Sequence, residues 1–157
     1  MKIKIICIGK TELKYLREGC QVYFDKLSHY CPIEYIEIPD NKKLKSLRIK
    51  EQKIGEGKLI VNALDSCDKL ILLDEKGKSF TSLEFSQFIQ KQINTSIKRI
   101  VFVIGGAYGF SEEIYEKSDA LVSLSPMTFS HQMVRLLFLE QLYRGFSILH
   151  NEPYHHI

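Results

Sequence analysis

The stretch RIVFVIGG, Arg99–Gly106, is the clearest indication of the fold. Its central residues are all apolar and β-branched or aromatic, without the alternation of a half-buried strand, and two glycines end the run. An unbroken apolar run of this length is typical of a strand buried on both faces, and such strands occur mainly in parallel sheets covered by helices.

Other short strands alternate with longer helical patterns along the chain. Strands are predicted at Lys2–Gly9, Ile33–Ile38, Lys69–Asp74 and Ala120–Ser125. Helices are predicted at Glu12–His29, from the basic segment to about Leu64, at Ser82–Ile93, and for a short stretch from Ser111. This alternation predicts an α/β fold, a mainly parallel sheet with helices on both faces. With no linker in the pattern, we expect residues 1–157 to form a single domain.

The composition is ordinary: of 157 residues, 45% are hydrophobic and 26% charged. The chain has no repeat, no low-complexity tract and no apolar run long enough to span a bilayer, and its first residues do not resemble a signal peptide. We therefore expect a cytoplasmic protein. Its four cysteines form no C-x-x-C pair, which argues against a zinc site or a disulfide framework.

One segment carries more positive charge than the whole chain, whose net charge is +3. Between Asp40 and Lys58, seven basic residues stand against three acidic ones, a local excess of four. A solvated helix face with a lysine-rich loop explains this pattern. The alternative is a polyanionic partner such as RNA, whose phosphates would make binding depend on salt.

Two stretches resemble nucleotide-binding patterns. Gly77–Ser79 matches the second half of a phosphate-binding loop, but Leu72 stands where the first glycine is required. A nucleotide triphosphatase is thus disfavoured, and a polar turn after the strand is predicted. Gly105, Gly106 and Gly109 lack the spacing of a nicotinamide-binding loop, yet they follow a buried strand, where α/β sheets usually bind ligands.

The third stretch is SLSPMTFSHQMVRLLFLEQLYRGF, Ser123–Phe146. Residues 125–129 form a predicted turn able to hold a flat heterocycle, and Ser130 is a plausible N-cap for the helix that follows. His131 and Arg135 are four residues apart, so they share one face of that helix. The helix is apolar on more than one face, which favours a dimer interface.

Three quoted segments together resemble one known family: FVIGGAYGF, LSPMTFSHQMVRLLFLEQLYRGF and the tail NEPYHHI. The chain resembles the ribosomal RNA large subunit methyltransferase H family of the SPOUT superfamily along its whole length. The resemblance implies an S-adenosylmethionine-dependent enzyme that methylates N3 of pseudouridine 1915 in 23S ribosomal RNA of the assembled ribosome. It also implies a homodimer, no metal, and a C-terminal trefoil knot within the SPOUT-type sheet.

The family's functional positions fall on all three segments and on Leu73, in the mid-chain stretch LLDEKGKSF, which also resembles the family. The implied cofactor-binding residues are Leu73, Gly105, Leu124, Ser125, Pro126, Met127, Thr128 and Phe129. The implied catalytic residues are His131, Arg135, Tyr154 and His155. We expect Arg135 to contact the RNA backbone or target base and His131 to order the site, while a histidine of suitable pKa is also able to act as a base.

Each of these residues also has a simpler interpretation. His131 is a helix-start residue, Arg135 a partner for a carboxylate, and the tail a frayed terminus. A metal site formed by His150, Glu152 and the last histidines is an improbable alternative. His156 replaces the arginine or lysine usual in the family, which predicts weaker RNA contact and a steeper loss of activity between about pH 6 and 8. A non-catalytic RNA-binding protein is the second functional hypothesis.

Overall fold

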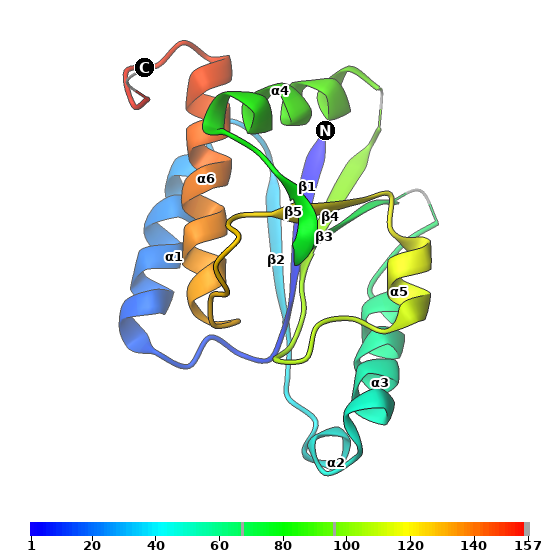
Figure 1. Cartoon of the computed structure of the whole chain (residues 1–157). Coiled ribbons are helices and arrows are strands. Elements are labelled where there is room, and N and C mark those ends of the chain that lie inside the picture. The colour runs from blue at the N-terminus through cyan, green and yellow to red at the C-terminus, as the bar shows by residue number, and fades with distance from the viewer. Residues whose placement is uncertain (67, 96, 156–157) are drawn as a thin grey trace.

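The computed structural model describes residues 1–66, 68–95 and 97–155. Its centre is a five-stranded sheet in which every neighbouring pair of strands is parallel (Figure 1). The strand order is β2-β1-β4-β3-β5. The strands are β1 (Lys2–Ile8), β2 (Ile33–Ile38), β3 (Asp68–Ser79), β4 (Arg99–Ile104) and β5 (Ala120–Ser123). The parallel α/β sheet predicted from the sequence is therefore confirmed.

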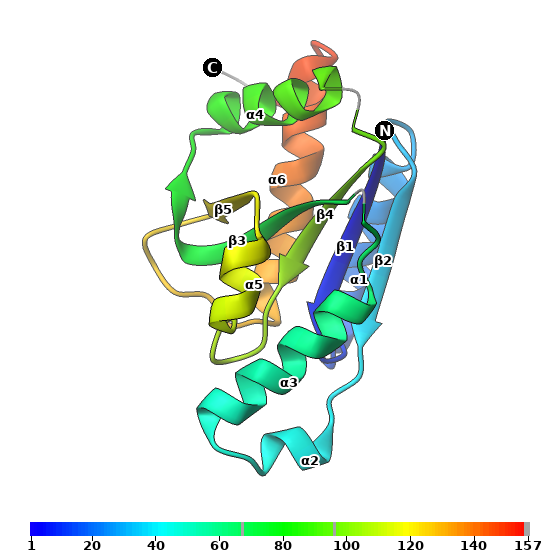
Figure 2. The ribbon, with the colours of Figure 1, turned by 90° about the vertical axis from the view of Figure 1, so that its right-hand side faces the viewer.

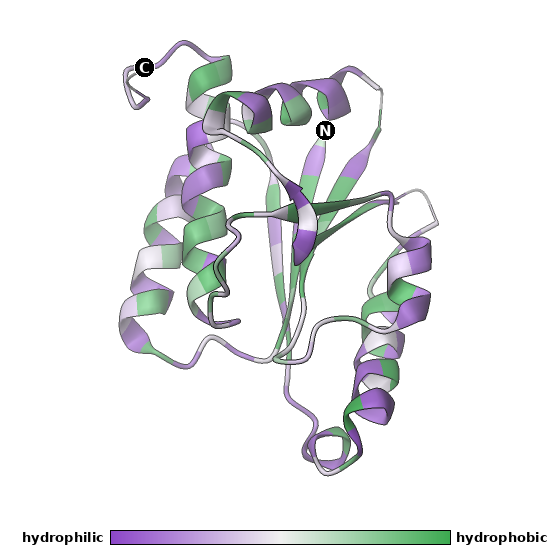
Figure 3. Ribbon diagram, viewed as in Figure 1, coloured by the Kyte–Doolittle hydropathy of each residue, from purple (hydrophilic) through white to green (hydrophobic). Residues whose placement is uncertain are grey.

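Helices cover both faces of this sheet, as the alternation predicts (Figure 2). α1 (Lys14–Leu27), α4 (Ser82–Asn94) and α6 (Met133–Leu149) pack on one face, and α3 (Ile49–Asn62) and α5 (Glu112–Lys117) pack on the other. The short α2 (Lys42–Lys45) precedes α3. Each face has its own apolar core, and in Figure 3 the hydrophobic residues concentrate on the strands and the inner helix surfaces.

β3 is longer than its apolar run. After a bulge between Leu73 and Lys78 the strand pairs with β5 again, so the polar turn predicted around Gly77 is wrong. A Cβ atom on Gly77 would lie 2.6 Å from the backbone of Leu121 and Val122, closer than real Cβ atoms come. The glycine is therefore required by strand packing, and nothing about it resembles a phosphate-binding turn.

α6 lies between α1 and α4 on its face of the sheet (Figure 1). None of its residues is exposed, and it approaches its neighbours closely at Gly145, beside Ile89, and at Leu136, beside Gly19. The extra apolar faces of this helix are thus used within the chain. The sequence argument allowed this helix only one intramolecular neighbour, so its apolar faces alone do not identify a dimer interface, and the homodimer stays a prediction.

Parallel strands place all their carboxyl ends at one edge of the sheet. The loops after β1, β2, β4 and β5 gather there, whereas Met1 and the segment after α6 lie at the opposite edge (Figure 1). This separation decides which residues share a site. Of the helices formed by the described residues, none combines the length and the apolar character that a membrane span needs.

Candidate active site

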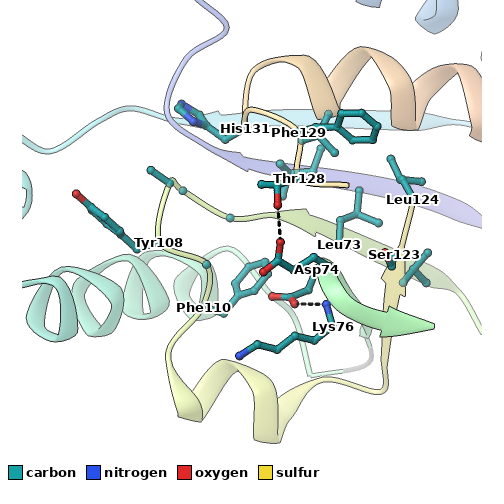
Figure 4. Close-up of a pocket in the computed structure, with 18 of the residues that line it drawn as sticks. Leu73, Asp74, Lys76, Tyr108, Phe110, Ser123, Leu124, Thr128, Phe129 and His131 are labelled. Atoms are coloured by element: carbon teal, nitrogen blue, oxygen red, sulfur yellow. Dashed lines mark hydrogen bonds between the residues drawn. The ribbon is translucent and has the colours of Figure 1, made fainter. Parts of the chain in front are cut away.

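A pocket of about 350 Å³ lies at the carboxyl-end edge of the sheet (Figure 4), within the usual size range of small-molecule sites. Its walls come from the bulged part of β3, the glycine loop after β4 and the loop between β5 and α6. Of the eight positions that the resemblance assigned to a cofactor, all except Pro126 line this pocket. Three segments far apart in the sequence therefore meet here.

The glycine loop forms a tight turn at the end of β4. Gly109 has a φ of +76°, a left-handed conformation that glycine adopts without strain, and its N–H donates to the carbonyl of Gly106 at 3.2 Å. The ring of Phe110 is buried behind the turn. Three glycines of this loop line the pocket together with the aromatic residues Tyr108 and Phe110 (Figure 4).

The loop between β5 and α6 is held by its own side chains. The hydroxyl of Ser123 donates to the carbonyl of Ser125 at 2.9 Å, and the hydroxyl of Ser125 accepts from the N–H of Met127 at 2.9 Å. Thr128 Oγ1 donates to Glu75 Oε2 at 2.9 Å, which joins this loop to the end of β3 (Figure 4). These hydrogen bonds fix the conformation of the turn that was expected here.

Two carboxylates in the bulged part of β3 give the pocket a negative side. Asp74 accepts from the hydroxyl of Tyr115 at 2.5 Å and from the N–H of Lys76 at 2.8 Å, and Glu75 is exposed beside it. Burial, together with the bond to Asp74, raises the pKa of Tyr115 to about 12. Sequence analysis did not select these acids, although their place directly after a buried strand was an available signal.

His131 lies on the pocket wall just before α6, and its side chain is half-buried. Burial, reinforced by the nearby charge of Arg135, lowers the pKa of this imidazole below its ordinary value of 6.5. At neutral pH the ring is therefore mainly uncharged and able to accept a proton. The neighbouring Ser130 accepts from the N–H of Met133 at 3.1 Å, as expected for a cap, although α6 itself begins at Met133.

Arg135 is completely buried and all three of its guanidinium nitrogens donate hydrogen bonds. Nη2 binds the carbonyl of Ile8 at 2.8 Å, Nη1 binds Thr11 Oγ1 at 2.8 Å, and Nε binds the carbonyl of His131 at 3.0 Å. Nη1 also lies 3.3 Å from Glu37, whose carboxylate accepts from the N–H and hydroxyl of Thr11. This network joins the ends of β1 and β2 to the first turn of α6.

This location differs from the expected contact of Arg135 with RNA, because the guanidinium has no exposed surface. The simpler interpretation, a partner for a carboxylate, fits the pair with Glu37. Thr11 and Glu37 were not selected from the sequence. They lie about 100 or more positions away from Arg135 in the chain, so only the fold brings them together.

The tail forms a second group of polar residues. Tyr154 donates to Glu140 Oε1 at 3.2 Å, its ring packs edge-on against Tyr143, and the guanidinium of Arg144 lies 4.8 Å from the ring centre. Arg144 also lies 3.4 Å from Nδ1 of His155. The described part of the tail is therefore bound to the end of α6, which differs from a frayed terminus.

The predicted catalytic residues thus fall into two groups at opposite ends of α6. His131 and Arg135 lie at its first turn, whereas Tyr154 and His155 follow its last turn (Figure 1). Tyr154 packs back onto Glu140, near the middle of α6, and neither Tyr154 nor His155 is among the residues that line the pocket. Within one chain the tail therefore does not reach the pocket. The prediction for His156 lies outside the described residues.

Neither a metal cluster nor a disulfide is found among the residues that the structure describes. Three of the four cysteines, Cys7, Cys20 and Cys31, are buried free thiols, and burial raises the pKa of each to about 11. A thiol with so high a pKa is protonated at neutral pH and is a poor nucleophile.

Comparison with known proteins supports one family over nearly the whole chain. The model of the family described as "Predicted SPOUT methyltransferase" matches residues 1–155. A protein of Christiangramia forsetii named "Ribosomal RNA large subunit methyltransferase H" is 56% identical over 156 residues, which cover 99% of each chain. A protein of the same name from Parabacteroides distasonis is 54% identical over the same length and coverage.

A solved structure supports the fold. A probable methylase family protein from Haemophilus influenzae aligns with a TM-score of 0.58 over 99% of this chain and 70% of its own, at 14% identity. That likeness concerns the fold alone, whereas the identities above establish the relationship by sequence. The chain therefore belongs to the ribosomal RNA large subunit methyltransferase H family of SPOUT methyltransferases.

Proposed function

We propose that this protein is an S-adenosylmethionine-dependent methyltransferase that acts on N3 of pseudouridine 1915 in 23S ribosomal RNA of the assembled ribosome. The names of its relatives support methylation of ribosomal RNA from the large subunit. The observation that carries the proposal is the pocket. It collects the glycine loop, Leu73 and the β5–α6 loop, which the family resemblance assigned to the cofactor, around one volume.

The chemistry of the pocket fits this cofactor. Apolar side chains of Leu73, Leu124 and Phe129 line one part and suit the flat adenine, while the glycine loop allows close approach of the ribose to backbone atoms. Asp74 and Glu75 add negative charge that suits the cofactor's ammonium and sulfonium groups. When bound, the cofactor supplies an electrophilic methyl group.

The protein's own part in the reaction is to position the uracil ring and remove the proton from N3. His131 is the pocket residue best suited to accept that proton, because burial keeps its imidazole uncharged at neutral pH. Arg135 acts through its hydrogen bonds. By holding the carbonyl of His131, it fixes the residue against the ends of β1 and β2, and is therefore a positioning residue.

We also propose that the protein works as a homodimer in which each tail completes the partner's site. The support is geometric: His131 lines the pocket, whereas Tyr154 and His155 do not and pack instead against Glu140 and Arg144, beyond the first turn of α6. A second copy is the simplest way to bring both groups to one substrate. The dimer interface then includes the end of α6 where the tail packs.

Three other features remain predictions that accompany this proposal. These are a C-terminal trefoil knot, a single domain over residues 1–157, and a cytoplasmic location beside the ribosome. Family membership supports all three.

The test is transfer of labelled methyl from S-adenosylmethionine to assembled ribosomes that lack this modification. Free 23S RNA and ribosomes that lack the pseudouridine serve as parallel substrates. We expect label on the first substrate alone. Label on all three would contradict the proposed target, and binding of ribosomes and cofactor without transfer would favour a non-catalytic RNA-binding protein.

Mixing two inactive variants tests the shared site. We expect His131→Asn and Tyr154→Phe to be inactive alone and to regain activity when they are co-folded as a mixture. The reason is that a mixed dimer has one site with an intact pocket and an intact tail. Persistent inactivity of a mixture shown to contain mixed dimers would contradict a tail that serves the partner.

A further inference from the structure

A surface rich in basic side chains lies beside the pocket. Residues 41–53, comprising α2, the residues after it and the start of α3, are called here the basic arm. The arm projects beyond the carboxyl-end edge of the sheet (Figures 1 and 2), and Figure 3 shows it as mainly hydrophilic. Its cations are Lys42, Lys43, Lys45, Arg48, Lys50 and Lys53.

Most of these cations have no acidic partner. Lys45 pairs with Asp40 at 2.8 Å, but Lys42, Lys43, Lys50 and Lys53 form no ion pair with any residue that the structure describes. The one acid of the arm, Glu51, is engaged with the backbone, because its carboxylate accepts from the N–H of Arg48 at 3.3 Å. The arm therefore keeps a net excess of positive charge, since four of its lysines have no acidic partner among the described residues.

The backbone of the arm is nonetheless ordered by local bonds. Asn41 caps α2 by accepting from the N–H of Lys43 at 2.9 Å, and the contact between Arg48 and Glu51 closes the start of α3. Farther along α3, the buried side chain of Gln52 donates to Glu56 at 3.0 Å. Cations on an ordered support lose little conformational freedom on binding, which favours a defined anionic partner over a merely solvated surface.

The arm also continues directly to the pocket. Lys53 is half-buried and lines the pocket, and Glu56, one turn further along α3, lies against Gly106 of the glycine loop. An anionic chain lying along the arm would thus end at the place where the base is methylated. A phosphate backbone has this shape and charge. A membrane surface would contact the arm alone, and membrane binding would not explain why the arm continues to the pocket.

We propose that the basic arm binds the phosphate backbone of the ribosomal RNA strand next to the target nucleotide. This proposal rests on the proposed function for the identity of the RNA. Lys42, Lys43 and Lys50 contact phosphates away from the reaction, and Lys53 marks where the strand enters the pocket. The arm consequently contributes to the affinity for the RNA, and not to that for the cofactor.

The experiment compares two double variants of the same charge. Lys42→Gln/Lys43→Gln removes two unpaired cations of the arm. Lys91→Gln/Lys98→Gln removes two exposed lysines at the end of α4 and just before β4, near the opposite edge of the sheet, and is the matched control. Binding to assembled ribosomes and the KM for their methylation are measured between 50 and 200 mM salt. Cofactor binding and the circular dichroism spectrum establish that each variant is folded.

We expect the arm variant to raise the Kd and KM for assembled ribosomes at low salt, with kcat and cofactor affinity unchanged. Loss of two phosphate contacts removes about 1.4 to 1.8 from the slope of log affinity against log salt. Its disadvantage relative to wild type therefore shrinks about tenfold between 50 and 200 mM salt. The control variant keeps the wild-type slope.

Equal slopes and KM values for the two variants would overturn the proposal while leaving the methyltransferase function intact. Loss of binding to vesicles containing anionic lipid, with ribosome binding unchanged, would overturn it in favour of a membrane surface. If the wild type transfers no methyl, the function fails, yet the salt dependence of ribosome binding still decides whether the arm binds RNA.

Discussion

Arg135 and the basic arm are both positively charged, and their surroundings are opposite. The Arg135 side chain is completely enclosed, and each guanidinium nitrogen has a protein acceptor. Lys42 and Lys43 are exposed, and neither has an acidic partner among the described residues. The buried charge of Arg135 thus stabilises the fold, whereas the exposed charges of the arm remain available for a partner. Burial distinguishes these two roles of positive charge.

The largest effect that follows from this comparison is on stability. Arg135→Met should lower the free energy of unfolding by about 3–5 kcal/mol, because it leaves Glu37 and two backbone carbonyls without their buried donor. Chemical denaturation followed by circular dichroism measures the change. A loss as small as that of a surface substitution would show that the network is not structural.

A smaller loss is expected when the network is weakened without removing its charge. Thr11→Val deletes a hydroxyl that accepts from Arg135 and donates to Glu37, at a residue only 4% exposed. We expect about 1–3 kcal/mol lower stability, the usual cost of leaving buried polar groups unpaired. Thr11→Ser keeps the hydroxyl and should remain close to wild type, and an equal loss in both variants would assign the effect to the missing methyl group instead.

The third prediction concerns pH. The pKa of His131 lies below 6.5, so its neutral form persists as the pH falls to that value, and activity that needs a neutral base declines only below the folded pKa. The acid limb of kcat should therefore lie below pH 6.5. A folded Arg135→Lys variant keeps the positive charge beside His131, so the acid limb of kcat should stay at the same pH. Arg135→Met removes that charge and should move the acid limb to higher pH. Identical limbs in all three proteins would exclude His131 as the titrating group.

The smallest expected effect is at the arm itself. Lys42→Gln/Lys43→Gln should change the thermal midpoint by no more than about 2 °C, because exposed side chains without partners contribute little to folding. Differential scanning calorimetry measures it, with Lys91→Gln/Lys98→Gln alongside. A clear loss of stability in the arm variant alone would mean that these lysines are structural, and the contrast with Arg135 would disappear.

The fold was predictable because its signals are local. The apolar run Arg99–Ile104 and the strand–helix alternation identify a parallel sheet, and such a sheet places its loops at one edge. Boundaries were less predictable where apolar character ended before the element did. β3 continues to Ser79 through polar residues, because its pairing with β5 resumes after the bulge.

The candidate site was predictable in part, for the same reason. The family motifs selected the loops that line the pocket, but whether a selected residue is exposed depends on contacts from distant segments. Arg135 is buried by Ile8 and Thr11, and α6 is enclosed by α1 and α4. Asp74 and Glu75 stand in the mid-chain family stretch but were not selected as site residues, and they line the pocket from the bulged part of β3.

The close packing of Gly77 against Leu121 and Val122 has a consequence for mutational tolerance. In a saturation scan of this stretch, every substitution at Gly77 would be rejected, while the exposed Lys78 and Ser79 would accept many. A stretch that resembles one nucleotide-binding motif would then contain one position that tolerates no substitution and two positions at which substitutions have little effect. Selection at this motif-like site acts on the space between two strands.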